Sequence, residues 1–189
     1  MQNIYLSKFN KITAFLLVVI SSVLIFSPLA KANLDEVIRD RVQATDTGFV
    51  DSSMQAITYL GDGAVDTIIA SALPDEEAKY DAYKSLLVGG LSVFTLKSII
   101  GKKRPPGPIE YNHFTLDSKY HAFPSGHTTT AFALATIIAE YYPDYKYLSY
   151  GLATLVGISR LYEDRHWFSD VVAGAGLGYA SAKFVKYKW

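Results

Sequence analysis

Residues 159–174 read SRLYEDRHWFSDVVAG. Arg160 closes one apolar run, and His166 and Asp170 flank the start of the next. Because positions four apart lie one above the other on a helix, an imidazole and a carboxylate at this spacing can pair. Pairing would leave the other ring nitrogen free to act as a nucleophile. A structural pair that only caps a helix start fits the same residues, so both interpretations stay open here.

Apolar runs of helical length recur outward from this stretch. A polar amphipathic opening at 34–44 is followed by runs near 49–73, 82–100, 127–142, 146–162 and 168–184. Each run is too long for an ordinary strand and shows no strict alternation. Proline and charged residues separate the runs at 74–77, 101–108 and 143–144. The sequence therefore predicts an all-α bundle of about five or six helices, with a long loop from 101 to 126 and the active site at one end.

The composition excludes several classes of protein. The chain has 189 residues, of which 50% are hydrophobic, enough for one domain with a substantial core. Its 18 basic and 18 acidic side chains give a formal net charge of zero, which disfavours a nucleic-acid partner. The sequence contains no cysteine, so disulfides, thiolate metal sites and thiol nucleophiles are excluded.

The N-terminus has the order of features typical of a secretory signal. Lys8 and Lys11 precede an uncharged run over 12–26, and the sequence Ala-Lys-Ala at 30–32 is a small-x-small cleavage site. We expect residues 1–32 to be a signal peptide cleaved after Ala32, or an uncleaved anchor. Residues 33–189 would then form one exported helical domain in the periplasm, or in the cell envelope facing the periplasm. Because the later apolar runs approach spanning length, an integral inner-membrane protein stays open.

Two further clusters of polar residues lie at expected helix ends. Lys97 and Arg104 are seven apart and would share a face if the turn at Gly101 does not rotate Arg104 away. The alternative is a solvated basic loop that includes the adjacent lysines at 102 and 103. Ser125, Gly126 and His127 precede the run at 127–142, and free amides at a helix start bind anions well. An N-cap with an incidental histidine fits them equally.

Together, the cations, the helix start and the two histidines indicate phosphoryl transfer. Cations can offset charge on the equatorial phosphate oxygens, one histidine can attack phosphorus, and the other can protonate the leaving oxygen. Such a mechanism requires no metal.

The three clusters resemble the three-part signature of the type 2 phosphatidic acid phosphatase and vanadium haloperoxidase superfamily. The matching segments are Lys97 with Arg104-Pro105, then Pro124-Ser125-Gly126-His127, then Ser159-Arg160 with His166 and Asp170. The resemblance implies that His166 forms a phosphohistidine, that Asp170 orients it, and that His127 is the general acid. It implies a phosphate site made of Lys97, Arg104, Arg160, Ser125 and Gly126.

The function that the resemblance implies is a metal-independent phosphatase without a cofactor. Its substrates would be lipid phosphates or diphosphates, with a membrane surface or bilayer as partner and no nucleic acid. The alternatives are an acid phosphatase for small soluble phosphomonoesters and a vanadate-dependent haloperoxidase, which the short chain disfavours. A metal-dependent hydrolase would use His121, His127, His166 and Asp170, but the chain lacks clustered two-histidine spacing. A nonenzymatic envelope protein is the remaining class.

Two histidines match no position of the signature. His113 and His121 lie in the long loop, where surface or substrate-rim roles are more typical than catalysis.

Overall fold

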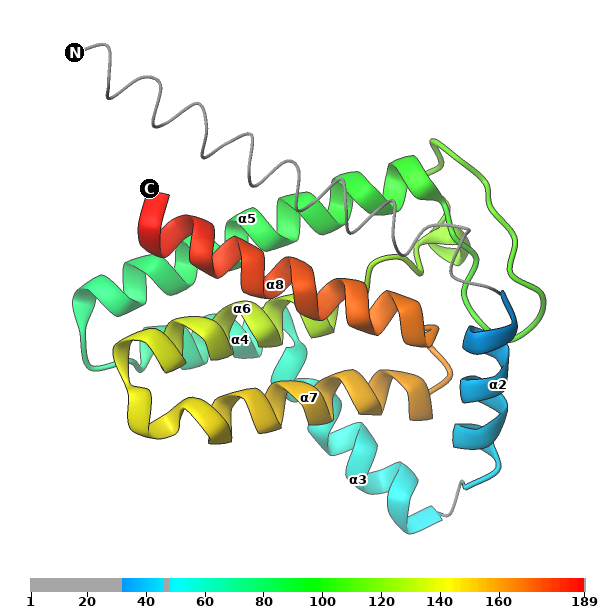
Figure 1. The fold of residues 1–189 in the computed structure, drawn as a ribbon, viewed down its shortest axis with the longest axis horizontal. Coiled ribbons are helices and arrows are strands. Elements are labelled where there is room, and N and C mark those ends of the chain that lie inside the picture. Colours follow the sequence, from blue (N-terminus) through cyan, green and yellow to red (C-terminus); the bar gives the residue numbers. More distant parts are fainter. Residues whose placement is uncertain (1–31, 46–47, 189) are drawn as a thin grey trace.

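The computed structural model describes residues 32–45 and 48–188, which form a bundle of α-helices (Figure 1). No strand occurs among these residues, where the β-type pairing is a single bridge between Lys102 and Tyr111. The prediction of an all-α fold is confirmed. The expected signal segment lies outside the described residues, apart from Ala32. The helices are α2 (Ala32–Gln43), α3 (Gly48–Thr58), α4 (Gly63–Ser71), α5 (Glu76–Ile100), α6 (Gly126–Tyr141), α7 (Lys146–Tyr162) and α8 (Phe168–Lys188).

The predicted run at 49–73 differs from the structure, because it forms two helices. α3 ends at Thr58, a 3₁₀ turn covers Tyr59–Gly61, and α4 begins at Gly63. Asp62 leaves the helical conformation with φ −75° and ψ 129°. Its side chain accepts a hydrogen bond from the amide of Ala64 at 2.9 Å. This N-cap starts a new helix inside an apolar run, so hydrophobicity alone did not reveal the break.

Helix α5 begins six residues earlier than predicted and ends in a glycine turn. Asp75 caps it by accepting from the amide of Ala78 at 3.0 Å. At the other end, Gly101 has φ 58°, in the left-handed region, and a Cβ there would lie 1.7 Å from the carbonyl oxygen of Asn112. Only glycine fits this turn without displacing the loop. The turn therefore determines where α5 ends and where the loop that carries Arg104 begins.

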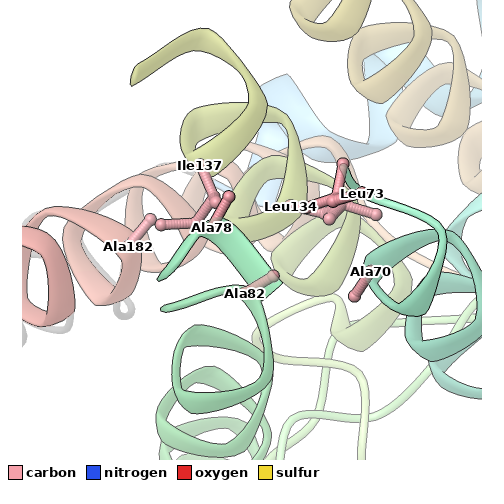
Figure 2. Close-up of a cluster of buried hydrophobic side chains, with 7 residues drawn as sticks. All are labelled: Ala70, Leu73, Ala78, Ala82, Leu134, Ile137 and Ala182. Atoms are coloured by element: carbon pink, nitrogen blue, oxygen red, sulfur yellow. The ribbon is translucent and has the colours of Figure 1, made fainter. Parts of the chain in front are cut away.

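Helices α5 to α8 lie side by side and run in alternating directions (Figure 1). The end of α5, the start of α6, the end of α7 and the start of α8 consequently meet at one end of the bundle. A cluster of buried apolar side chains fills the bundle further from that end (Figure 2). Its members are Ala70, Leu73, Ala78, Ala82, Leu134, Ile137 and Ala182. Apolar packing therefore holds the helices together while leaving their other end for polar groups.

Small residues let α8 approach α6 very closely. A Cβ at Gly174 would lie 2.6 Å from the carbonyl oxygen of Ser125, and one at Gly178 would lie 2.2 Å from that of Thr129. Near this contact the amide of Ser125 donates to the carbonyl oxygen of Asp170 at 2.9 Å. Backbone contact of this kind requires glycine on the facing helix. It fixes the start of α6 against the start of α8.

We expect Gly178→Ala to lower the free energy of unfolding by about 1–3 kcal/mol, because the added methyl meets backbone that cannot move aside. Denaturant unfolding measures the change. Gly176→Ala is the matched control, since it lies in the same helix and a Cβ there meets no atom within 4 Å. The control should be neutral or stabilising by up to about 1 kcal/mol. Equal stability of the two variants would contradict the close packing of α6 and α8.

Candidate active site

The polar residues singled out in the sequence meet at one end of the bundle. Lys97 lies in the last turn of α5, and Arg104 lies in the loop that follows. Ser125 and His127 belong to the start of α6, and Arg160 to the last turn of α7. Asp170 lies in the first turn of α8, and His166 lies two residues before that helix begins. Segments up to 73 residues apart in sequence thus contribute to one polar region.

His166 lies between a carboxylate and a guanidinium. Its Nδ1 is 3.5 Å from Oδ2 of Asp170, and its Nε2 is 3.3 Å from Nη1 of Arg104. A guanidinium can only donate, so Nε2 must accept and the ring proton must reside on Nδ1, facing the carboxylate. The Nδ1 contact is longer than a formed hydrogen bond, as is common in catalytic sites without substrate. The geometry therefore leaves Nε2 with a lone pair directed toward a cation.

Burial keeps the imidazole of His166 uncharged. It lowers the pKa of His166 to about 3, and the positive charges of Lys97 and Arg104 act in the same direction. The carboxylate of Asp170 opposes this shift. A neutral imidazole retains its nucleophilic lone pair even in acidic solution.

Asp170 is held in a fixed orientation by two donors. The amide of Trp167 donates to Oδ2 at 2.9 Å, and Nζ of Lys102 donates to Oδ1 at 2.9 Å. Burial alone would raise the pKa of Asp170, but the charge of Lys102 holds it below its usual range. A solvated basic loop that includes Lys102 is one alternative that the sequence allows, but the Lys102 side chain is buried. No local signal in the sequence distinguishes it from Lys103, which is only half-buried.

The three cations of the predicted phosphate site are each fixed by oxygen acceptors. Lys97 donates to the carbonyl oxygen of His121 at 2.6 Å, and Arg104 to that of Arg165 at 2.9 Å. Nη1 of Arg160 donates to Thr58 and Glu163, both at 2.5 Å. Arg104 and Arg160 line a cavity of about 500 Å³. Its lining consists of Arg104, Ser118, Lys119, Arg160, Glu163 and Arg165.

Arg104 reaches the site from the loop and not from a continued helix face. α5 ends at Ile100, so the predicted seven-residue helical spacing from Lys97 does not apply. Instead the amide of Arg104 donates to the carbonyl oxygen of Lys119 at 2.9 Å, which holds this part of the loop. The two cations still lie close enough for the charge of Arg104 to act on Lys97. Lys97 and Arg104 therefore lie near one another as predicted, but the loop brings them together and not a shared helix face.

The start of α6 is capped and also open to a ligand. Oγ of Ser125 accepts from the hydroxyl of Thr128 at 2.9 Å and faces the Thr128 amide at 3.5 Å. A Cβ at Gly126 would meet nothing closer than Val93, at 3.7 Å. Packing within the protein therefore does not require glycine at this position. Space remains above the Gly126 backbone, where an anion can approach the helix start.

His127 is uncharged when no anion is bound. Burial and the positive charge of Arg160 lower the pKa of His127 to about 4, and Lys97 and Arg104 act in the same direction. A phosphate dianion among these cations would offset their charge and raise the pKa again. Protonation of His127 is thus coupled to occupation of the site.

The two loop histidines do not join the cluster through their side chains. His113 is exposed and stacks on Tyr111 with ring centroids 6.0 Å apart. Nε2 of His121 is 3.1 Å from the carbonyl oxygen of Thr115. Within residues 32–45 and 48–188, no three His, Asp or Glu side chains converge as the ligands of a metal ion would.

Comparison with known proteins identifies the family of this chain. Residues 81–189 match the PAP2 superfamily, and the chain belongs to that superfamily. It is 39% identical to the lipid A 1-phosphatase of Porphyromonas gingivalis over 102 residues, which cover 52% of this chain and 20% of that protein. Lipid A 1-phosphatases from two Rhizobium species also match it, and the matched segment spans less than half the length of each of these three relatives.

Two solved structures share the fold. One is the crystal structure of LpxE from Aquifex aeolicus, with a TM-score of 0.71 and 23% identity, covering 82% of this chain and 96% of that one. The other is the crystal structure of a transmembrane PAP2-type phosphatidylglycerolphosphate phosphatase from Bacillus subtilis. It has a TM-score of 0.63 and 19% identity, and the match covers 95% of this chain and 94% of that one.

We expect Gly126→Ala to weaken binding of inorganic phosphate about tenfold, or roughly 1.4 kcal/mol, because the methyl would occupy the approach to the helix start. Titration calorimetry measures the dissociation constant, and thermal unfolding checks that the melting temperature is unchanged. Gly151→Ala on α7 is the control, since a Cβ there meets no atom within 4 Å and the position lies outside the site. Phosphate binding by Gly126→Ala within twofold of the unaltered chain would contradict an anion site at the start of α6.

Proposed function

We propose that this chain is a metal-independent phosphatase that hydrolyses lipid phosphates through a phosphohistidine at His166. The observation that carries the proposal is the placement of the ring. Nε2 of His166 lies 3.3 Å from Nη1 of Arg104, which can only donate, and Nδ1 lies 3.5 Å from Oδ2 of Asp170. An imidazole held in this way can attack a phosphorus atom whose oxygens are bound by the neighbouring cations.

In the first step, Nε2 of His166 forms a bond to phosphorus and the bond to the leaving alkoxide oxygen breaks. His127, protonated once the phosphate dianion is bound, donates its proton to that oxygen. Asp170 stabilises the positive charge that develops on the imidazole. Lys97, Arg104 and Arg160 offset negative charge on the three equatorial oxygens.

In the second step, water replaces the departed alcohol. His127, now neutral, accepts a proton from the water as its oxygen attacks phosphorus, and the phosphorus–nitrogen bond breaks. Inorganic phosphate leaves, and His166 returns to its neutral form. Each step uses residues of this chain alone.

A lipid substrate is supported by the apolar surface of the bundle. Leu87, Leu91 and Phe94 are spaced along one face of α5 and are each more than half exposed. α7 exposes Tyr147 and Leu148 in the same way. Of the described helices, α5 is the one whose length and composition would suffice to cross a bilayer. We propose that these faces contact lipid and that the site faces the periplasm, where a headgroup can reach the polar end.

Replacement of the two site histidines should have different consequences. We expect His166→Ala to reduce phosphatase turnover by several orders of magnitude, since no other group replaces the nucleophile. His127→Ala should impair alkyl phosphates more than nitrophenyl phosphate, because a phenolate leaves without a proton. His113→Ala is the control and should be unchanged. Steady-state phosphate release measures all three variants. The two substrates are compared by kcat/KM, which reports formation of the phosphohistidine and not its hydrolysis, and equal loss of kcat/KM for both by His127→Ala would exclude its role as the acid.

A substrate panel distinguishes the alternatives. We expect phosphatidic acid, phosphatidylglycerol phosphate or undecaprenyl diphosphate in mixed micelles to be hydrolysed at least tenfold more efficiently than nitrophenyl phosphate, with no loss in EDTA. Preference for the arylphosphate would indicate a soluble acid phosphatase instead. Activity lost in EDTA and restored by a divalent cation would indicate a metal-dependent hydrolase, and peroxidase activity on addition of vanadate would indicate a haloperoxidase.

A further inference from the structure

A buried lysine beside the site has a role that the signature residues do not explain. Lys102 is 2% exposed. Its Nζ donates to Oδ2 of Asp35 at 2.8 Å, to Oγ of Ser169 at 2.7 Å and to Oδ1 of Asp170 at 2.9 Å. An ammonium group has three protons, so each of them has one acceptor. The lysine therefore has a single orientation, and one of its partners is the carboxylate behind His166.

Asp35 comes from a distant part of the chain. It belongs to α2, is 3% exposed, and lies 135 residues before Asp170. Its Oδ1 accepts from the amide of Ser169 at 2.8 Å, and its Oδ2 accepts from the hydroxyl of Ser169 at 2.6 Å. Asp35 thus contacts both Lys102 and the first turn of α8. Burial of a carboxylate is costly unless it is paired in this way.

The charges of this cluster determine what it does for His166. With only Lys102 and Asp170, the buried pair would be neutral and would attract a positive imidazole weakly. Asp35 adds a second negative charge, so the three groups together carry −1 while His166 is neutral. When Nε2 bonds to phosphorus, the imidazole becomes positive and the whole assembly becomes neutral. A net negative cluster in a buried site stabilises that change more strongly than a neutral one.

We propose that Asp35 and Lys102 are positioning residues for phosphoryl transfer. Lys102 fixes the carboxylate of Asp170 so that Oδ2 faces His166. Asp35 offsets the charge of Lys102, so that Asp170 retains its effect on the imidazole. This inference rests on the proposed function, because it concerns the charge that develops on His166 during transfer.

A second contact of α2 provides a control. It separates the loss of the Asp35 charge from a weaker attachment of α2 to the bundle. Arg39 binds Asp164 through two hydrogen bonds of 2.6 and 2.8 Å, which also attach α2 to the segment before α8. This pair does not touch Asp170. Asp164 has φ 52°, a conformation that asparagine also tolerates. Asp164→Asn therefore weakens the attachment of α2 without changing the charge beside Asp170.

The test compares Asp35→Asn with Asp164→Asn in the full chain, with melting temperatures to confirm folding. We expect Asp35→Asn to lower kcat about tenfold or more and to weaken orthovanadate inhibition by the same factor, because a vanadate adduct on His166 imitates the transition state. Inhibition by inorganic phosphate, which needs the cations and the start of α6 but no bond to His166, should stay within twofold. Asp164→Asn should leave all three quantities within twofold.

A double variant tests whether Lys102 is needed as well. Asp35→Asn with Lys102→Met removes both partners of the buried pair, so Asp170 loses the donor that orients it and keeps it ionised. We expect this variant to bind orthovanadate no more tightly than Asp35→Asn does. The proposal is overturned if Asp35→Asn retains kcat within twofold, if Asp164→Asn loses as much, or if the double variant recovers the orthovanadate affinity of the unaltered chain. Absence of phosphatase activity in the unaltered chain would instead refute the proposed function.

Discussion

The backbone contact between α6 and α8 is the constraint on which the site depends. Gly174 and Gly178 bring the two helices so close that the amide of Ser125 bonds to the carbonyl oxygen of Asp170. This bond joins the segment that carries His127 to the segment that carries His166. A side chain in the contact would move these two segments apart, and in the mechanism that we propose one phosphoryl group must reach both histidines. Backbone packing therefore determines how the two segments of the site meet.

Burial and charge work together at the end of the bundle. Removing His166 and Asp170 from water disfavours their charged forms, so the imidazole is neutral and the carboxylate needs Lys102 to stay ionised. The same low-dielectric surroundings strengthen the attraction between a phosphate and the cations around it. Burial and the neighbouring cations thus keep both site histidines neutral, and we propose that a bound phosphoryl group favours their charged forms.

The sequence predicted the helices where hydrophobic runs ended at proline or charge, and α7 has the predicted bounds of 146–162. It missed the break at Asp62, because one capping side chain interrupted an otherwise continuous apolar run. The spacing of the signature residues predicted which groups meet at one end. It did not reveal that Lys102 and Asp35 pair, since the partners lie 67 residues apart and neither has a local pattern. Such buried pairs depend on tertiary packing, which periodicity does not describe.

The most direct test of the central claim is to trap the covalent intermediate. The protein would be mixed with a phosphate ester, quenched within milliseconds in alkali, where phosphohistidine survives, and digested for mass spectrometry. Our account predicts one phosphate on the peptide that contains His166, and none when His166→Ala is treated in the same way. Turnover without any phosphorylated peptide, or a phosphate on His127 in place of His166, would contradict the account.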